Sequence, residues 1–315
     1  MKVFVTGLTG FVGPHLARML VGKGCEVEGL GFCMEKFGRG QSLPSGVSVV
    51  NTDIRDYAGL LQILKGSRPS HIFHLAAISN VAISFANPRL TYEVNVGGTL
   101  NLFEALRELE LNPQIVYVSS ALVYCSIHAE KGLTEDSPVH LQSPYAASKF
   151  MCESLVSQYV ESYGFHAMTV RPFNHIGPGQ PTGFVCSDFA RQIAAIRLGL
   201  AEPVLHVGNL TPVRDFTDVR DTVEAYWKVA TQGISGEIYN VSSNLPLSIQ
   251  EVVSILCKLA DVEVSIMVDK EKIRPVETMC LFGNSSKIRA LGWKSHIEIE
   301  QTLKDILEYW LSVLA

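Results

Sequence analysis

A glycine-rich turn near the N-terminus limits this chain to few folds. A short apolar run at residues 2–6 leads into Gly7, Gly10 and Gly13, and apolar residues at helical spacing follow at 12–21. A strand, a sharp turn and a helix in this order let the backbone approach a pyrophosphate at the positive end of the helix. Because the glycines directly follow a strand, they predict a dinucleotide-binding domain.

Short apolar runs alternate with helical segments along the first half of the chain. This alternation predicts βαβ units with right-handed crossovers, and therefore an α/β protein with a Rossmann-type, doubly wound parallel sheet. We expect strands at residues 2–6, 27–32, 47–51, 71–75, 114–119, 167–170 and 238–241, and helices at 12–21, 91–109, 145–163 and 297–314.

The composition of the sequence changes after Arg171. Proline and glycine become frequent, beginning with residues 177–181, and we expect loops with short mixed elements there. This change predicts a smaller, less regular domain that binds the substrate. The expected boundaries are residues 1–172 plus about 213–243 for an NAD(P)-binding Rossmann domain, and about 173–212 plus 244–315 for the smaller domain.

Composition and charge exclude several classes of protein. The net charge of −5 gives no sign of a basic surface for nucleic acid, so we expect no nucleic-acid partner. The seven cysteines are scattered without CxxC pairs, which predicts neither a disulfide framework nor a metal site. We also expect no signal peptide and no membrane span. These features predict a soluble, cytoplasmic protein.

A serine, a tyrosine and a lysine form the candidate catalytic group. Tyr145 and Lys149 stand four residues apart near the start of a predicted helix, so they share one face of it. A phenol has an unperturbed pKa near 10, and a neighbouring ammonium would lower the pKa of Tyr145. Tyr145 could then exchange a proton with a carbonyl or alcohol oxygen, and Ser120, at a predicted strand end, could hydrogen-bond that oxygen.

These features together resemble the extended short-chain dehydrogenases/reductases over essentially the full chain. The resemblance implies an NAD(P)-dependent enzyme in which Ser120, Tyr145 and Lys149 are the catalytic set. The matching motifs are Thr6-Gly7-Leu8-Thr9-Gly10-Phe11-Val12-Gly13, His74-Leu75-Ala76-Ala77, Asn95-Val96-Gly97-Gly98-Thr99, Val118-Ser119-Ser120 and Ser143-Pro144-Tyr145-Ala146-Ala147-Ser148-Lys149.

The resemblance also implies where the cofactor binds. Lys149 would hold the nicotinamide ribose, and Asn95 would support the site, although Asn95 could instead cap a helix. Asp53 would contact the adenine or, alternatively, cap a turn. The expected cofactor-binding set is Gly7, Gly10, Phe11, Val12, Gly13, Asp53, Ile54, Leu75, Ala76, Ala77, Asn95, Tyr145 and Lys149.

The end of the second predicted strand bears on the choice between NADP and NAD. NAD-selective sites place an acidic residue about 20 positions after the glycine turn, whereas this chain has Gly31 near that point. Lys36 and Arg39 follow, and they could contact a 2′-phosphate or be solvated loop cations. We therefore favour NADP(H) and keep NAD(H) as the alternative.

The residues after Ser120 separate the activities of this family. Its sugar-nucleotide dehydratases have acidic residues in a Ser-Thr-Asp-Glu or Ser-Thr-Ser-Glu motif, whereas this chain has Ala121 and Leu122. Neither side chain exchanges protons, which argues against dehydration. Several 4-epimerases have alanine at the first of these positions, whereas the reductases carry a polar or acidic residue there. These two positions therefore do not identify the sugar of the substrate.

The second half resembles the GDP-4-keto-6-deoxymannose reductases. The matching runs are Arg171-Pro172-Phe173-Asn174-His175-Ile176-Gly177-Pro178-Gly179-Gln180, Gly183-Phe184-Val185, Gly208-Asn209-Leu210, Arg214-Asp215-Phe216-Thr217-Asp218-Val219-Arg220-Asp221, Arg274-Pro275 and Gly292-Trp293. Arginine can donate two parallel hydrogen bonds to a diphosphate, although Arg214 could instead pair with Asp218 or Asp221. The expected substrate ligands are Ser79, Asn174, Val185, Asn209, Arg214 and Arg274.

The activity that this resemblance implies is the NADPH-dependent reduction of the C4 ketone of a GDP-4-keto-6-deoxyhexose to a GDP-6-deoxyhexose of the GDP-D-rhamnose type. The nucleotide-diphosphate sugar is thus expected to be a GDP-sugar. An NDP-sugar 4-epimerase with tightly bound NAD is the first alternative, and a non-catalytic NADP-binding regulatory protein is the second. The family commonly pairs subunits through two long helices, here about residues 94–109 and 145–163, so we expect a homodimer.

Overall fold

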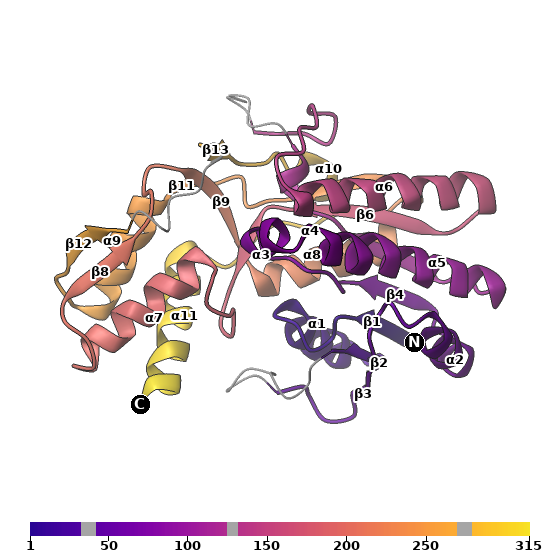
Figure 1. Ribbon diagram of the computed structural model, residues 1–315, viewed down its shortest axis with the longest axis horizontal. Coiled ribbons are helices and arrows are strands. Elements are labelled where there is room, and N and C mark those ends of the chain that lie inside the picture. Colours follow the sequence, from indigo (N-terminus) through magenta and orange to yellow (C-terminus); the bar gives the residue numbers. More distant parts are fainter. Residues whose placement is uncertain (33–41, 125–131, 270–278) are drawn as a thin grey trace.

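A seven-stranded parallel sheet forms the centre of the structure, a computed structural model that describes residues 1–32, 42–124, 132–269 and 279–315 (Figure 1). The strand order reverses between β1 and β4, and ligands of open α/β sheets bind at such a reversal, beside the carboxyl ends of the strands. The strands, in spatial order, are β3 (Ser48–Asn51), β2 (Glu26–Gly31), β1 (Lys2–Thr6), β4 (His71–His74), β5 (Gln114–Val118), β6 (Ala167–Pro172) and β10 (Ile238–Val241). The predicted α/β fold class is confirmed.

Helices cover both faces of this sheet and bury two hydrophobic cores. Val3 and Val5 of β1 pack under the helices of one face, and Phe4 packs under those of the other, because successive strand residues point to opposite sides. Fully burying such a side chain contributes about 1.5–3 kcal/mol. The helices are α1 (Val12–Gly22) and α8 (Val219–Gln232) on one face, and α2 (Tyr57–Ser67), α5 (Gly98–Glu108) and α6 (Pro144–Tyr163) on the other.

The helix predicted at residues 91–109 is interrupted. The structure divides this region into α4 (Pro88–Tyr92), a π-helical segment at Glu93–Gly97 and α5. A π-helical turn holds one extra residue, and such turns often occur at functional sites. The helices α2 and α3 (Val81–Ala86), which precede this region, were not predicted.

The second half contains more helix than the sequence analysis predicted. Its core is formed by α7 (Val185–Arg197), α9 (Ile249–Ala260) and α11 (Ile299–Leu314), which lie together beside β8 and β12 in Figure 1. The expectation of loops with short mixed elements was therefore wrong. The remaining elements are β7 (Asn174–Ile176), β8 (Val204–Val207), β9 (Val213–Asp218), β11 (Pro246–Ser248), β12 (Ser265–Val268), β13 (Cys280–Leu281) and α10 (Ser286–Arg289).

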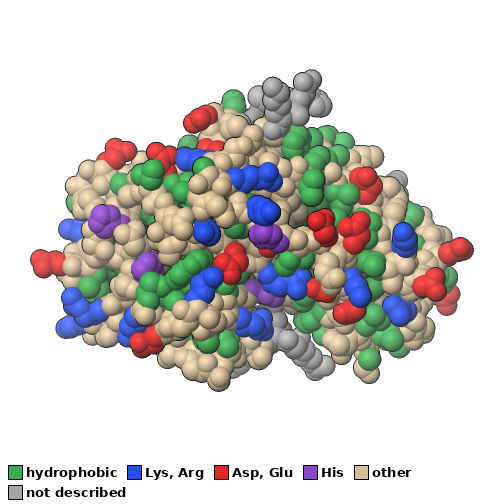
Figure 2. All heavy atoms as spheres, turned by 180° about the vertical axis from the view of Figure 1, so that it is seen from behind, with side chains coloured by type: hydrophobic (Ala, Val, Ile, Leu, Met, Phe, Trp, Pro, Cys, Tyr) green, Lys and Arg blue, Asp and Glu red, His purple; other side chains and the backbone are tan. Residues whose placement is uncertain are grey.

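Charged side chains of both signs are interspersed on the face of the molecule that Figure 2 shows. This mixture agrees with the small net charge of −5. Within the described ranges, no helix combines the length and the apolar character that crossing a membrane requires.

Candidate active site

The glycine turn has the geometry that a bound pyrophosphate requires. Gly7 has a φ of +73°, and a Cβ on it would lie 2.9 Å from the backbone nitrogen of Ala76. A Cβ on Gly13 would lie 2.1 Å from the carbonyl oxygen of Leu8, so only glycine allows α1 to pack this closely on the turn. The turn therefore brings bare backbone to the positive end of α1, where a dinucleotide phosphate fits.

Two further predicted cofactor residues, Phe11 and Val12, lie at the start of α1. The Phe11 ring stacks on the ring of His175, with centroids 6.1 Å apart, and contacts His15 edge-on. This side chain therefore joins the glycine turn to the second half of the protein, and the binding of the cofactor by Phe11 stays a prediction. Leu75, Ala76 and Ala77 follow β4 directly, as expected.

Asp53 has a structural partner in its own loop. Its carboxylate accepts the backbone N–H of Arg55 at 2.9 Å and pairs with the guanidinium at 2.6 Å, and this hydrogen-bonded guanidinium lowers the pKa of Asp53. The structure thus shows a turn-capping contact, and the binding of adenine by Asp53 stays a prediction. Ile54 is buried in the core under α2 and α5. Lys36 and Arg39 lie outside the described residues.

Asn95 lies within the π-helical segment and not at a helix N-terminus, so the alternative reading of it as a helix cap is wrong. Its side-chain oxygen accepts the N–H of Ile78 at 2.8 Å, and its amide donates to Ser148 at 2.8 Å. Asn95 therefore connects the loop after β4 to helix α6, which carries Tyr145 and Lys149.

The structure brings together Ser120, Tyr145 and Lys149. Ser120 follows β5 and begins a short 3₁₀ turn at Ala121–Val123, while the other two project from the first turns of α6. Two local features favour the start of this helix at Pro144. The side chain of Ser143 accepts a hydrogen bond from the backbone N–H of Ala146 at 3.1 Å, and proline occupies the first helical position. The side chains of all three predicted catalytic residues are buried, and Ser120 lies near enough to the Tyr145 hydroxyl to oppose the rise in its pKa.

The expected effect of Lys149 on Tyr145 is not what the structure shows. Burial raises the pKa of Tyr145 to about 12, opposed by the hydrogen bond from Ser120. The ammonium of Lys149 instead donates to the carbonyl oxygen of Val118 at 2.7 Å and lies over the ring of Tyr117. Tyr145 is therefore a protonated phenol at neutral pH, which suits a proton donor.

Burial also lowers the pKa of Lys149 to about 8, against an unperturbed value near 10.4. The folded chain thus binds this proton more weakly than the unfolded chain does. Keeping Lys149 charged in the folded protein therefore lowers the free energy of unfolding by its full amount below pH 8. This loss of stability disappears as the pH rises from 8 toward 10.5 and the folded protein gives up the proton. We expect wild-type stability, measured relative to Lys149→Met by urea unfolding, to rise by about 2–3 kcal/mol between pH 7 and 10. Parallel curves for the two proteins would contradict this.

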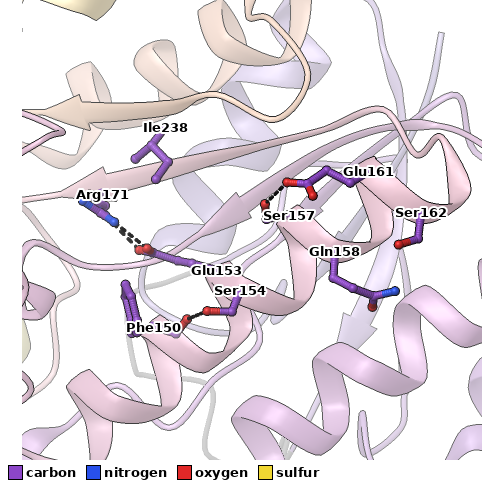
Figure 3. Close-up of a pocket in the computed structure, with 9 residues that line it drawn as sticks. All are labelled: Phe150, Glu153, Ser154, Ser157, Gln158, Glu161, Ser162, Arg171 and Ile238. Carbon is purple, nitrogen blue, oxygen red and sulfur yellow. Dashed lines mark hydrogen bonds and ion pairs between the residues drawn. The ribbon is translucent and has the colours of Figure 1, made fainter.

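A buried ion pair that the sequence analysis did not identify contacts Ser119, the residue before Ser120. Glu153, one turn after Lys149, binds the guanidinium of Arg171 through two hydrogen bonds of 2.9 and 2.6 Å, and Ser119 also donates to it. An acidic residue four positions after the lysine, on the same helix face, was the available signal. Both residues of this pair line a pocket of about 400 Å³ beside α6 (Figure 3).

This pocket is not the predicted site. Its lining contains none of the three predicted catalytic residues. Its charged groups are paired within the lining, Glu153 with Arg171 and Glu161 through a hydrogen bond of 2.9 Å from Ser157. The lining therefore offers no unpaired cation to a diphosphate.

The predicted substrate residues of the second half lie at separate points of the fold, two of them on β9 or the strand paired with it. Asn174 pairs with Phe216 in the β7–β9 ladder, and Arg214 stands on β9 itself. Val185 begins α7, and the Asn209 side chain accepts two hydrogen bonds from Thr211 within its own loop. Ser79 is exposed after β4, and Arg274 lies outside the described residues.

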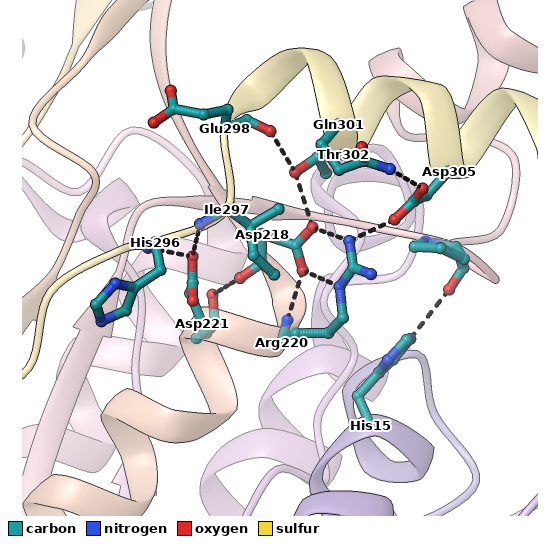
Figure 4. A network of polar contacts seen from close by, with 12 residues as sticks. His15, Asp218, Arg220, Asp221, His296, Ile297, Glu298, Gln301, Thr302 and Asp305 are labelled. Atoms are coloured by element: carbon teal, nitrogen blue, oxygen red, sulfur yellow. Dashed lines mark hydrogen bonds and ion pairs between the residues drawn. The ribbon is translucent and has the colours of Figure 1, made fainter.

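The aspartates proposed as alternative partners for Arg214 are engaged elsewhere (Figure 4). Asp218 pairs with Arg220 at 2.7 Å and accepts a hydrogen bond from Thr302 of α11. Asp221 accepts the backbone N–H groups of His296 and Ile297, at 2.9 Å each. The two carboxylates therefore attach α11 and the segment before it to β9 and α8.

Comparison with known proteins places this site in a family. The family described as GDP-mannose 4,6 dehydratase matches residues 4–306. A GDP-6-deoxy-D-mannose reductase of Pseudomonas aeruginosa is 35% identical over 99% of this chain and 97% of its own.

Two solved structures share the fold over nearly their whole length. That of RMD from Pseudomonas aeruginosa, complexed with NADPH, has a TM-score of 0.86 and 34% identity over 99% of both chains. That of a UDP-glucose 4-epimerase from Thermus thermophilus, in complex with NAD, has a TM-score of 0.88 and 29% identity over 98% of this chain and 99% of that one. The chain therefore belongs to the GDP-mannose 4,6-dehydratase family of extended short-chain dehydrogenases/reductases, which are enzymes of nucleotide-sugar chemistry.

Proposed function

We propose that this protein reduces the C4 ketone of a GDP-4-keto-6-deoxyhexose with NADPH, giving a GDP-6-deoxyhexose of the GDP-D-rhamnose type. The observation that carries the proposal is the protonated, buried phenol of Tyr145 beside Ser120, followed by Ala121 and Leu122, which have no titratable group. A dehydratase needs an acid and a base here to expel water, whereas a reductase needs one proton donor. The similarity to a GDP-6-deoxy-D-mannose reductase supports the same activity.

Each catalytic residue has a separate task in this mechanism. When bound, NADPH supplies the hydride to C4. Tyr145 donates its proton to the ketone oxygen, and Ser120 orients that oxygen by a hydrogen bond. Lys149 holds the nicotinamide ribose, and Arg214 and Arg274 neutralise the diphosphate.

The end of β2 supplies a reason for the preference for NADPH. A Cβ on Gly31 would lie 2.5 Å from the Cγ2 of Thr9 in the glycine turn, so an aspartate that selects NAD does not fit there. We expect Gly31→Asp alone to weaken the binding of both cofactors, because Thr9 must move. Adding Thr9→Ala removes the two contacts with Thr9 and leaves the Cγ1 atom of Val49 at 3.0 Å. The double variant should favour NADH over NADPH by at least about 10-fold, because the carboxylate repels the 2′-phosphate. Fluorescence titration with each cofactor measures both effects, and an unchanged preference in a folded double variant would contradict this account.

The proposed function is tested by following nicotinamide absorbance with GDP-4-keto-6-deoxymannose made in situ and with NADPH or NADH. Stoichiometric oxidation with a GDP-deoxyhexose product supports the reductase and identifies its cofactor. An absence of oxidation, together with NAD that copurifies with the protein, would instead support the 4-epimerase. The alanine at position 121 and the likeness to a UDP-glucose 4-epimerase structure are the observations that favour this second candidate.

A further inference from the structure

A histidine that the mechanism does not use lies buried beneath the site, between two threonines. The Nδ1 atom of His74 is 2.6 Å from the hydroxyl of Thr6, the last residue of β1. Its Nε2 atom is 2.9 Å from the hydroxyl of Thr99 in α5. All three side chains are buried, and the sequence motif of residues 74–77 had assigned the histidine no role.

The neighbouring groups determine the direction of every hydrogen bond in this cluster. Thr99 must donate to the carbonyl oxygen of Asn95, 2.5 Å away, because a carbonyl cannot donate. Thr99 therefore accepts from the Nε2–H of His74. The Nδ1 of the neutral ring is then an acceptor for the Thr6 hydroxyl, which in turn accepts the backbone N–H of Ala76 at 3.1 Å.

The two ends of this chain of hydrogen bonds lie at the two functional parts of the site. One end is the Ala76 amide, beside Gly7 and the predicted pyrophosphate position. The other is Asn95, whose side chain donates to Ser148, which donates to the carbonyl oxygen of Tyr145. We propose that His74 is a positioning residue that couples the cofactor-binding turn to helix α6, through a directed chain of hydrogen bonds that ends at the backbone carbonyl of Asn95 and through the separate bond that the Asn95 side chain makes to Ser148. This inference rests on the proposed function, in that Gly7 and Ala76 bind a nicotinamide cofactor.

The ionisation of the ring fits this role. Complete burial, assisted by the charge of Lys149, lowers the pKa of His74 to about 3. The ring therefore stays neutral in one tautomer across the physiological range, and the direction of the chain does not change with pH.

The proposal is tested by removing a link that is distant from the cofactor. Thr99→Val keeps the shape of the side chain and deletes one hydroxyl. The matched control is Thr222→Val, because Thr222 is also buried in a helix and donates to the carbonyl four residues earlier, that of Asp218, at 2.9 Å. We expect Thr99→Val to raise amide exchange at Ala76 and the Kd of NADPH about 5-fold each, the effect of one neutral hydrogen bond, and Thr222→Val to change neither by more than about 2-fold.

Two measurements make the outcomes distinguishable. Amide exchange at Ala76 needs no ligand, so it tests the chain of hydrogen bonds even if the wild-type protein binds neither NADPH nor NADH. Such a failure to bind either cofactor would refute the proposed function and, with it, the coupling to the cofactor. Nitrogen NMR of labelled histidine, assigned by comparison with His74→Gln, should show the Nε2–H tautomer. An Nδ1–H tautomer, or a Thr99→Val protein with normal exchange and normal Kd, would overturn the coupling.

Discussion

Replacing Tyr145 with phenylalanine is expected to lower kcat by about 10²- to 10⁴-fold, the usual contribution of a positioned proton donor. The phenol lies beside Ser120, and burial keeps it protonated at neutral pH, so in the proposed mechanism its hydroxyl is the proton source for the reduced oxygen. The substitution removes one oxygen and leaves the ring in its buried position. We therefore expect the free energy of unfolding to change by less than about 1 kcal/mol.

The control for this experiment is Tyr163→Phe at the other end of α6. Tyr163 is 51% exposed, so loss of its hydroxyl should leave both kcat and stability near the wild-type values. Initial rates with saturating substrate, together with thermal unfolding, measure the two quantities. A Tyr145→Phe enzyme with near-normal turnover would remove Tyr145 from the mechanism.

The parts of this site that the sequence predicted have local signals. The glycine turn follows a strand and opens a helix, and Ser143 with Pro144 marks the start of α6, so the placement of Tyr145 and Lys149 on one face could be predicted. Helix α9 also had a local signal that was overlooked, the capping box of Ser248 and Glu251.

Other features depend on contacts between distant parts of the chain. The π-helical segment around Asn95 adds a single residue to a helical turn, which hardly alters an apolar periodicity. The pKa of Tyr145 depends on its burial, and the partners of His74 come from β1 and α5, 68 and 25 residues away in the sequence. Such effects arise from tertiary packing, which spacing along the sequence does not specify.

The buried pair of Glu153 and Arg171 leads to the largest expected effect on stability. Both side chains of this pair (Figure 3) are nearly inaccessible, at 5% and 4% exposed. The guanidinium also lies 4.8 Å from the ring centroid of Tyr124. Glu153→Ala would leave the guanidinium buried without its counter-ion, which typically costs about 3–5 kcal/mol. The matched control is Glu161→Ala two turns later on the same helix, where the carboxylate is exposed and the cost should stay within about 0.5 kcal/mol.

A double variant distinguishes the electrostatic contribution of the ion pair to stability from the contribution of its packing. If the cost of Glu153→Ala comes from the stranded charge of Arg171, replacing both residues with leucine should destabilise far less than the sum of the two single changes, because an apolar pair leaves no buried charge. Urea unfolding followed by both fluorescence and circular dichroism measures these free energies, provided that the two transitions coincide. If the single costs simply add in the double variant, the stabilisation comes from packing, and the charges of the pair then contribute nothing to the stability of the region around Ser119.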